Sequence, residues 1–331
     1  MLRRCKDRQV PSYGRRFCGA GLGSRARWKV PLLPLIGMAG LATLALSSSA
    51  AVGLFVANGG VGSNDTTFDT LDPATALSAS GGSSATLNWT ATGDTYASGH
   101  RVLRGTASGG PYSQIAEVTP RATTTYVDSP AAGNFYYVVR AFFQNWESVD
   151  SNQVSAGHTG YLSCGANAAV TTGSGDNNGY QLNPGNACAD DASFAEDTNS
   201  GTTTTNSCSN TGKDRHLYYN YSASIPAGST INGIELRLDA WADGTSATPY
   251  ICAELSWNGG ASWTAAKVTA NLTAAQATYT LGAATDTWGR AWTISDFSNA
   301  NFRVRLTDVA TNNNRDFRLD YLALRVSYAP P

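Results

Sequence analysis

Side chains and motifs that carry catalysis or bind transition metals are scarce in this sequence. Only three of its 331 residues are histidines, His100, His158 and His216, and their scatter argues against a His-based zinc site. There is no Gly-x-Ser-x-Gly elbow, no phosphate-binding loop and no His-Glu-x-x-His pair. Two carboxylates can hydrolyse a glycosidic bond when a fold holds them roughly 5 to 10 Å apart. We therefore expect a non-catalytic protein, with a glycoside hydrolase as the less favoured alternative.

Charge is absent from one long segment near the start. Residues 30–64 are 35 consecutive uncharged residues, and residues 1–29 before them carry nine basic side chains against one acidic side chain. Such a basic head stays in the cytoplasm while the apolar run enters the bilayer. We predict that residues 1–57 form a signal peptide or a membrane anchor and that the rest is exported. The small residues at 47–51 favour cleavage near Ala51, and an uncleaved anchor is the alternative.

Basic residues are also few beyond the head, where 14 face 23 acidic residues. An acidic surface repels nucleic-acid phosphates, and no basic patch with interleaved aromatic residues is present. These features argue against nucleic acid as a partner.

Four of the six cysteines belong to the exported part: Cys164, Cys188, Cys208 and Cys252. In an oxidising compartment an even number of cysteines predicts two disulfides, for which three pairings exist. We favour Cys164–Cys188 and Cys208–Cys252, because each of these bonds would fasten a long polar loop to a strand.

Residues 71–156, between linkers at 58–70 and 157–160, alternate apolar and polar side chains in short runs, which is typical of a small β-sandwich. The unit resembles a bacterial fibronectin type III domain, with His100 in place of the usual aromatic residue. The resemblance is carried by Trp89, Val102, Arg104, Tyr137, Val139 and Ala141. It implies that Trp89 and Tyr137 belong to the core and that the domain acts as a spacer.

Residues 161–331 show no helical period and have turn clusters every dozen or so residues, which favours an antiparallel sandwich. The alternation after residue 229 predicts a strand with an apolar inner face, made of Ile234, Leu236, Leu238, Ala240 and Ala242. A second strand should turn Phe302, Val304 and Leu306 inward.

A change of phase between Leu319 and Leu322 predicts a β-bulge near Asp320. The motif Ile-Pro-x-Gly-x-x-Ile-x-Gly-Ile, which starts at Ile225, resembles jelly-roll modules of bacterial surface proteins and carbohydrate-active enzymes, many of which bind glycans. The expected fold class is all-β, a fibronectin type III sandwich and a larger jelly-roll antiparallel sandwich after an N-terminal signal or anchor helix.

The segment SWNGGASW, residues 256–263, resembles the Asp-box of sialidases and related β-proteins, with Asn258 in place of the aspartate. The motif is a hairpin whose side chain at that position bonds the local backbone. A single copy favours a structural role over a sialidase propeller.

Trp241 is the candidate glycan platform, since periodicity places it on the charged face of its strand. An exposed indole stacks on the apolar face of a sugar while polar neighbours bind the hydroxyls. The neighbours expected to do so, if their strands lie side by side, are Glu235, Arg237, Asp239, Arg303 and Arg305. The alternative is a cross-strand ladder of ion pairs with Trp241 covered by a loop.

Four acidic residues within eight positions, Asp190, Asp191, Glu196 and Asp197, form a candidate structural calcium site. Solvated surface acids are the more common explanation of such a cluster. We expect no other cofactor.

These features predict an exported bacterial cell-surface or secreted protein in which the fibronectin type III spacer presents the jelly roll for glycan or surface binding. Its expected partner is an extracellular or cell-surface polysaccharide, with the membrane as a second contact if the leader is not cleaved. The alternative is a matrix or envelope subunit that self-associates through its sandwich edges. Residues 50–70 favour this alternative, because they resemble the leaders of biofilm-fibre and camelysin-type surface proteins.

Overall fold

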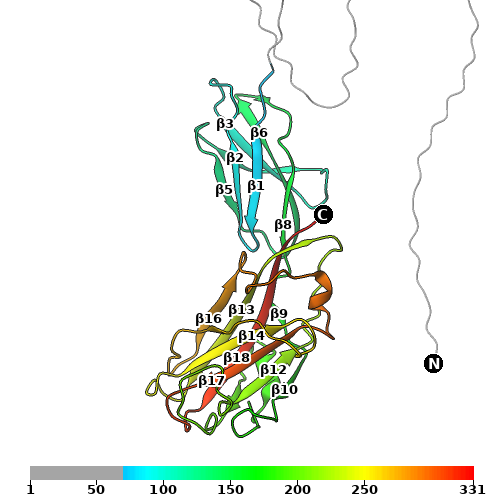
Figure 1. The fold of residues 1–331 in the computed structure, drawn as a ribbon. Helices are drawn as coiled ribbons and strands as arrows, with labels where there is room; N and C mark the ends of the chain where they lie inside the picture. Colours follow the sequence, from blue (N-terminus) through cyan, green and yellow to red (C-terminus); the bar gives the residue numbers. More distant parts are fainter. Residues whose placement is uncertain (1–69) are drawn as a thin grey trace, which may run out of the picture. The chain divides into compact units, whose positions relative to one another are not determined.

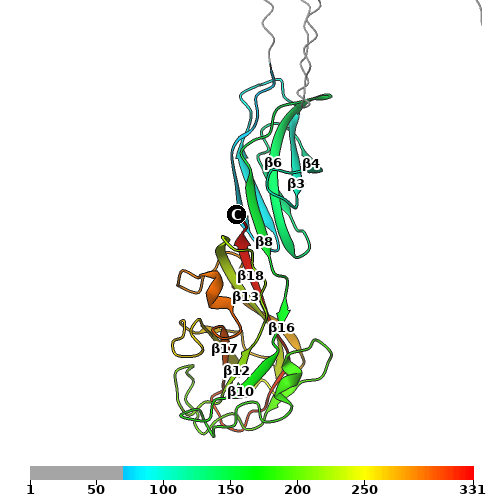
Figure 2. The same cartoon turned by 90° about the vertical axis from the view of Figure 1, so that its right-hand side faces the viewer.

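The computed structural model describes residues 70–331, whose regular secondary structure is almost entirely β-strand (Figures 1 and 2). The signal or anchor segment predicted at residues 1–57 lies outside the described residues. From residue 70 onward, no helix has the length and apolar character needed to cross a bilayer.

The first sandwich consists of two antiparallel sheets. One contains, in spatial order, β1 (Thr75–Gly81), β2 (Ala85–Thr90) and β5 (Thr125–Asp128). The other contains β4 (Ser113–Val118), β3 (Gly99–Gly105), β6 (Gly133–Phe143) and β8 (Val154–His158), with β7 (Trp146–Glu147) beside β6. Alternating side chains from both sheets fill the space between them, as the sequence pattern predicts.

Trp89 and Tyr137 belong to this core, as the resemblance implies. Trp89 is 6% exposed, and its ring packs edge-on against that of His100 at a centroid distance of 5.5 Å. Tyr137 is fully buried and donates a hydrogen bond of 2.9 Å to Asp128 Oδ2, which also forms an ion pair with Arg104. His100 therefore fills the place of the missing aromatic residue by packing its ring against the indole.

The second sandwich also has two sheets. The central strands of one are β16 (Ala277–Ala283), β13 (Thr230–Ala242) and β18 (Phe317–Ala329), with β9 (Leu162–Ser163) and β11 (Ala195–Asp197) paired to β18. The other contains β10 (Ala166–Ala169), β12 (Arg215–Tyr219), β17 (Arg303–Val309), β14 (Tyr250–Ser256) and β15 (Lys267–Val268). Two short 3₁₀ helices, η1 (Pro184–Ala187) and η2 (Ile294–Phe297), lie in its connections.

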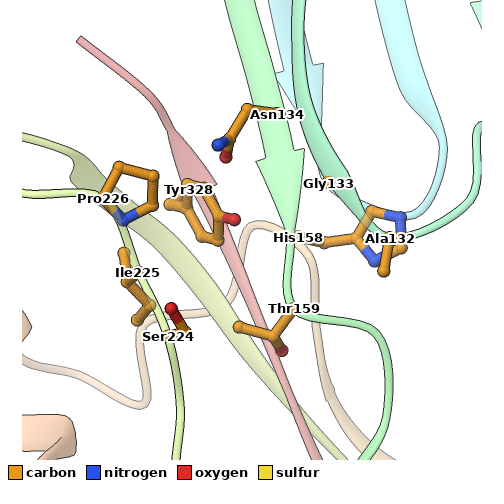
Figure 3. A pocket seen from close by; sticks show the side chains of 9 residues that line it. All are labelled: Ala132, Gly133, Asn134, His158, Thr159, Ser224, Ile225, Pro226 and Tyr328. Carbon is orange, nitrogen blue, oxygen red and sulfur yellow. The ribbon is translucent and has the colours of Figure 1, made fainter. Parts of the chain in front are cut away.

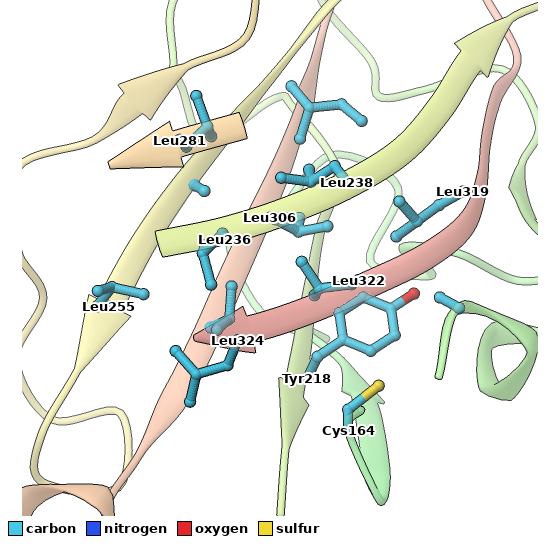
Figure 4. Packing of buried hydrophobic residues seen from close by; sticks show 14 of the residues in the cluster. Cys164, Tyr218, Leu236, Leu238, Leu255, Leu281, Leu306, Leu319, Leu322 and Leu324 are labelled. Carbon is cyan, nitrogen blue, oxygen red and sulfur yellow. The ribbon is translucent and has the colours of Figure 1, made fainter. Parts of the chain in front are cut away.

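The predicted inner faces of β13 and β17 are correct. Every predicted inward residue of both strands is buried in one core (Figure 4), where leucines such as Leu238, Leu306 and Leu322 meet. The bulge in β18 is also confirmed: Asp239 pairs with Tyr321 and Ala240 with Leu319, so Asp320 has no partner in the register. Because of this extra residue, Leu319 before the bulge and Leu322 after it both face the core of the sandwich, although they are three positions apart.

Two disulfides fasten loops to the second sandwich in the pairing that the sequence favours. Cys164 bonds to Cys188, which lies just after η1, and Cys208 bonds to Cys252 in β14. The second bond holds the loop of residues 199–212 against the outer side of the five-stranded sheet.

Strand β8 takes part in the sheets of both sandwiches. It pairs with β6 along its whole length, and its last two residues also pair with β18 through Gly157–Tyr328 and His158–Ser327. A hydrogen bond of 3.0 Å from the Tyr136 hydroxyl to the carbonyl of Pro331 adds to this continuity.

Candidate functional site

The outer face of β13 carries a ladder of ion pairs and hydrogen bonds. Glu235 forms an ion pair with Arg325 and accepts a hydrogen bond from the Tyr161 hydroxyl. Arg237 pairs with Asp239, its neighbour two positions along the strand. Burial and the hydrogen bond to Glu235 raise the pKa of Tyr161 to about 12. The polar groups of this face therefore already bond to each other.

Trp241 is covered from the side by another aromatic residue. The Phe194 ring, from the loop that precedes β11, packs edge-on against the indole at a centroid distance of 5.0 Å. Arg318 is the cross-strand neighbour of Trp241 and pairs with Glu196. Of the two interpretations of this face, these contacts favour the ion-pair ladder, with Phe194 of a neighbouring loop packed against the half-buried Trp241.

Arg303 and Arg305 do not join Trp241, and this part of the predicted site is wrong. Their strand, β17, belongs to the five-stranded sheet, whereas the neighbours of β13 are β16 and β18. The outward side chains of the two sheets in a sandwich point in opposite directions. The six predicted glycan-site residues are therefore divided between opposite faces of the domain.

Arg303 and Arg305 instead belong to a second face, on the outer side of the five-stranded sheet. Cross-strand register places Arg303 between Tyr219 of β12 and Ser256 of β14, and Arg305 between Leu217 and Glu254. The alternate residues of these strands, such as Tyr218 and Val304, are fully buried in the core, so the two arginines point outward.

Two aromatic rings lie against these guanidinium groups. The guanidinium carbon of Arg303 is 4.5 Å from the ring centre of Tyr219, and that of Arg305 is 4.2 Å from the ring centre of Trp263. Arg305 also forms a 2.7 Å ion pair with Glu254. All five side chains are half-buried, and cation–π contacts of this kind fix the rings in place. We call Tyr219, Glu254, Trp263, Arg303 and Arg305 the arginine face.

The Asp-box-like hairpin brings Trp263 to this face. Ser256 Oγ accepts a 2.8 Å hydrogen bond from the backbone N–H of Gly260, and Asn258 Oδ1 accepts one of 2.9 Å from that of Ser262. Gly259 and Gly260 have φ angles of 75° and 102°, which suit glycine. The backbone of Thr264 then returns to bond Leu255, so Trp263 lies at the base of the hairpin beside β14. Asn258 thus does the structural work expected of an Asp-box aspartate.

The loop of residues 199–212 covers the part of this outer side that lies beyond Arg305 along β17. Thr307 and Cys252, the next outward residues of β17 and β14, are fully buried beneath it. Arg215 of β12 bonds the loop carbonyls of Cys208 and Asn210. The loop contains no charged residue, and eleven of its fourteen residues are threonine, serine or asparagine, so hydroxyl and amide groups dominate it.

Sequence reasoning found the two arginines but missed Tyr219, Glu254 and Trp263. Tyr219 lies one position after a buried tyrosine at the end of β12, so strand alternation contained the signal. Trp263 was recognised only as part of a structural hairpin. Trp263 lies next to Arg305 only because β14 pairs with β17, and these strands are about 50 residues apart in the sequence.

The four predicted calcium ligands do not converge. Asp190 forms an ion pair with Arg237, and Glu196 pairs with Arg318, whereas Asp191 is exposed. Asp197 is fully buried, because alternation along β11 turns it to the opposite side from Glu196. Within residues 70–331 no group of three or more histidine, cysteine or acidic side chains is placed to hold a metal ion.

Asp197 instead belongs to a buried group of carboxyls with Asp308 and Asp214. Burial raises the pKa of Asp308 to about 8, and burial together with the neighbouring Asp308 raises that of Asp197 well above its usual value. The Tyr180 hydroxyl donates a 3.1 Å hydrogen bond to Asp308 Oδ1. Asp197 and Asp308 are 0% and 2% exposed, so a substrate cannot reach this carboxyl pair. The pair does not provide glycosidase chemistry.

A pocket of about 340 Å³ lies where β8 meets β18 (Figure 3). Most of its polar groups already bond within the protein: His158 Nδ1 accepts a 3.0 Å hydrogen bond from Gly160 N–H, and Thr159 Oγ1 accepts one from Val326 N–H. Asn134 Oδ1 is buried without a hydrogen-bond partner. One such amide does not make a set of convergent groups, so the arginine face remains the stronger candidate.

Comparison with known proteins finds solved structures with low TM-scores. No protein-family model and no curated protein matches this sequence. An Fn3-like protein from Clostridium thermocellum is 34% identical over 26% of this chain and 90% of its own, with a TM-score of 0.23. A two-domain fibronectin type III segment of chicken tenascin is 9% identical over 72% and 92% of the two chains, with a TM-score of 0.25.

A further similar structure comes from work on carbohydrate-binding modules of the β-sandwich superfamily. It is 9% identical over 76% of this chain and 97% of its own, with a TM-score of 0.27.

The molecule's own topology gives the assignment of each sandwich. The first places three strands, β1, β2 and β5, against four, β4, β3, β6 and β8, around Trp89 and Tyr137. The second packs two larger antiparallel sheets around one core. The described chain therefore folds as a fibronectin type III sandwich followed by a larger jelly-roll antiparallel β-sandwich.

Proposed function

We propose that this chain is an exported, non-catalytic protein whose jelly-roll domain binds polysaccharide on the arginine face, while the fibronectin type III domain acts as a spacer. One observation carries the proposal: Tyr219 and Trp263 are half-buried and fixed against guanidinium groups on neighbouring strands. Such rings stack on sugars, and the nearby charged and amide groups suit the hydroxyls.

Export is supported by two features of the chain. Its basic head precedes a long uncharged run, and its two disulfides suit an oxidising compartment. A location at the cell surface or in the medium gives a polysaccharide-binding domain direct access to its ligand.

The proposal is tested by retention on a panel of soluble and insoluble polysaccharides, with Trp263→Ala and Trp241→Ala compared. We expect Trp263→Ala to weaken binding roughly tenfold, since one aromatic contact contributes about 1 kcal/mol and its apolar area adds more. Trp241→Ala is the matched control, because it removes the same side chain from the opposite face and should leave binding unchanged.

Equal binding by both variants and the parent would contradict the assignment of the face. Filaments of purified protein without any affinity for polysaccharide would instead favour the matrix-subunit alternative.

A further inference from the structure

Some lysines and arginines among residues 70–331 form no ion pair with a carboxylate, and most of these lie close together in the fold. Of its fourteen lysines and arginines, ten form an ion pair with an aspartate or glutamate. The four that do not, among residues 70–331, are Arg121, Lys213, Arg215 and Arg303. Three of these four belong to β12, to β17 or to the residues leading into β12.

Two of the three point to the outer side of the five-stranded sheet. Arg303 bonds only the backbone carbonyls of Asn299 and Phe302, so its charge is not compensated. Arg215 bonds only backbone carbonyls, and it lies close enough to Arg305 that burial and this neighbour lower its pKa. Lys213 differs, because its Nζ is directed into the protein, to the carbonyls of Thr203 and Ala310.

Acidic groups are few around these arginines. Glu254 is engaged by Arg305, and Arg215 is buried and lies within reach of the charges of Glu254 and Asp214, which leaves the charge of Arg303 as the local surplus. The flanking segments, residues 199–212 and 256–263, contain no charged residue at all. This positive site is set in a chain that has 14 basic and 23 acidic residues beyond residue 29. A polyanion would be repelled by the surface in general and attracted here.

We propose that the arginine face selects an acidic polysaccharide, one that carries carboxylate groups on its sugars, and that Arg303 binds the carboxylate. This inference rests on the proposed function and adds the chemical class of the ligand. A guanidinium fork matches a planar carboxylate with two parallel hydrogen bonds, while Tyr219 and Trp263 stack on the neighbouring sugar rings. Arg303 lies opposite Tyr219 in the register, so charge and ring are adjacent.

The test uses pairs of polysaccharides that share a backbone and differ in charge: polygalacturonate with its methyl-esterified form, and carboxymethylcellulose with methylcellulose. Binding of the full chain is measured by interferometry at low and moderate salt. We expect the parent to prefer an acidic member at least tenfold over its neutral counterpart, and the preference to fall as salt screens the charges.

Three variants locate the effect. Arg303→Gln should lose most of the preference for the acidic polysaccharide while keeping its affinity for the neutral one. Arg303→Lys should retain part of that preference, because lysine keeps the positive charge but lacks the paired N–H donors of the guanidinium. Arg121→Gln is the charge-matched control: it removes the unpaired arginine of the first sandwich, which bonds only the Thr92 carbonyl, and should change nothing. This control also accounts for any binding by the basic head, which is identical in all variants.

The outcomes separate the two proposals. Equal affinity for acidic and neutral members, abolished by Trp263→Ala, would overturn the acidic-ligand inference and leave polysaccharide binding in place. Retention by none of the four would overturn both. An equal loss in Arg303→Gln and Arg121→Gln would show general charge attraction and refute the site. Competition by single-stranded DNA that Arg303→Gln abolishes and Arg121→Gln leaves in place would refute selection of a polysaccharide.

Discussion

The buried carboxyl pair predicts an unusual dependence of stability on pH. An aspartate in the unfolded chain ionises near pH 4, whereas burial raises the pKa of Asp308 to about 8 in the folded protein. Between these values the folded state holds a proton that the unfolded state has released. The contribution of Asp308 to the free energy of unfolding is therefore fully present below pH 4 and is lost as the pH rises toward 8.

The magnitude follows from linkage. One such proton gives a slope of about 1.4 kcal/mol per pH unit, so from pH 5 to pH 7 the contribution falls by about 2 to 3 kcal/mol. Asp308→Asn removes the titrating group and keeps an oxygen that can accept the hydrogen bond from Tyr180. The stability of this variant relative to the parent should rise steadily with pH over this range.

The assay is urea unfolding with intact disulfides, followed by tryptophan fluorescence from pH 5 to pH 8. Five of the seven tryptophans among the described residues belong to the jelly-roll domain, so its transition dominates the signal. Asp191→Asn, at an exposed site, is the control and should leave the pH slope of the parent unchanged. If Asp308→Asn and the parent gave parallel pH curves, Asp308 would be ionised in the fold and the reasoning would be wrong.

Three further changes test the framework of the jelly-roll domain and the charge balance of the arginine face. Replacing Cys208 and Cys252 by serine should lower the free energy of unfolding by about 4 kcal/mol, because the disulfide closes a loop of 44 residues. Replacing Cys164 and Cys188, whose loop spans 24 residues, should lower it by about 3.5 kcal/mol. Urea unfolding measures both losses, and the reverse order would contradict the chain-entropy estimate. Gly282→Ala should lower the free energy of unfolding by about 1–3 kcal/mol, since the φ of Gly282 is +80° and a Cβ would lie 2.2 Å from the Ile234 carbonyl oxygen. Gly93→Ala is the control and should change stability little, because the space around Gly93 is open. Equal melting temperatures of the two variants would refute the predicted strain at Gly282. Glu254→Gln should release Arg305 from its ion pair and strengthen binding of polygalacturonate a few-fold, which interferometry would measure. Weaker binding would contradict this expectation and would mean that Glu254 holds Arg305 in its binding position.

Local patterns predicted the parts of the fold that depend on neighbours along the chain. Alternation identified the inner faces of β13 and β17, and the phase change in β18 located the bulge at Asp320. The same rule, extended two residues beyond Leu306, would have placed Asp308 inward. The buried carboxyl pair was therefore partly visible in the sequence.

Strand order and loop cover were not accessible in the same way. Alternation shows that Arg303 and Trp241 both point outward, but only long-range pairing decides that β17 and β13 belong to different sheets. Phe194 covers Trp241 from a loop 47 positions earlier, and no periodic pattern reports such a contact. The division of the predicted site into two faces follows from these non-local contacts.

Binding of polysaccharide at the arginine face can be observed residue by residue with indole NMR. In protein labelled with ¹⁵N at tryptophan, each indole N–H gives its own signal, and oligogalacturonate or its methyl ester is added in steps. We expect a saturable shift of the Trp263 signal while that of Trp241, on the opposite face, stays in place. A saturable shift of Trp241 with Trp263 unmoved would refute binding at the arginine face.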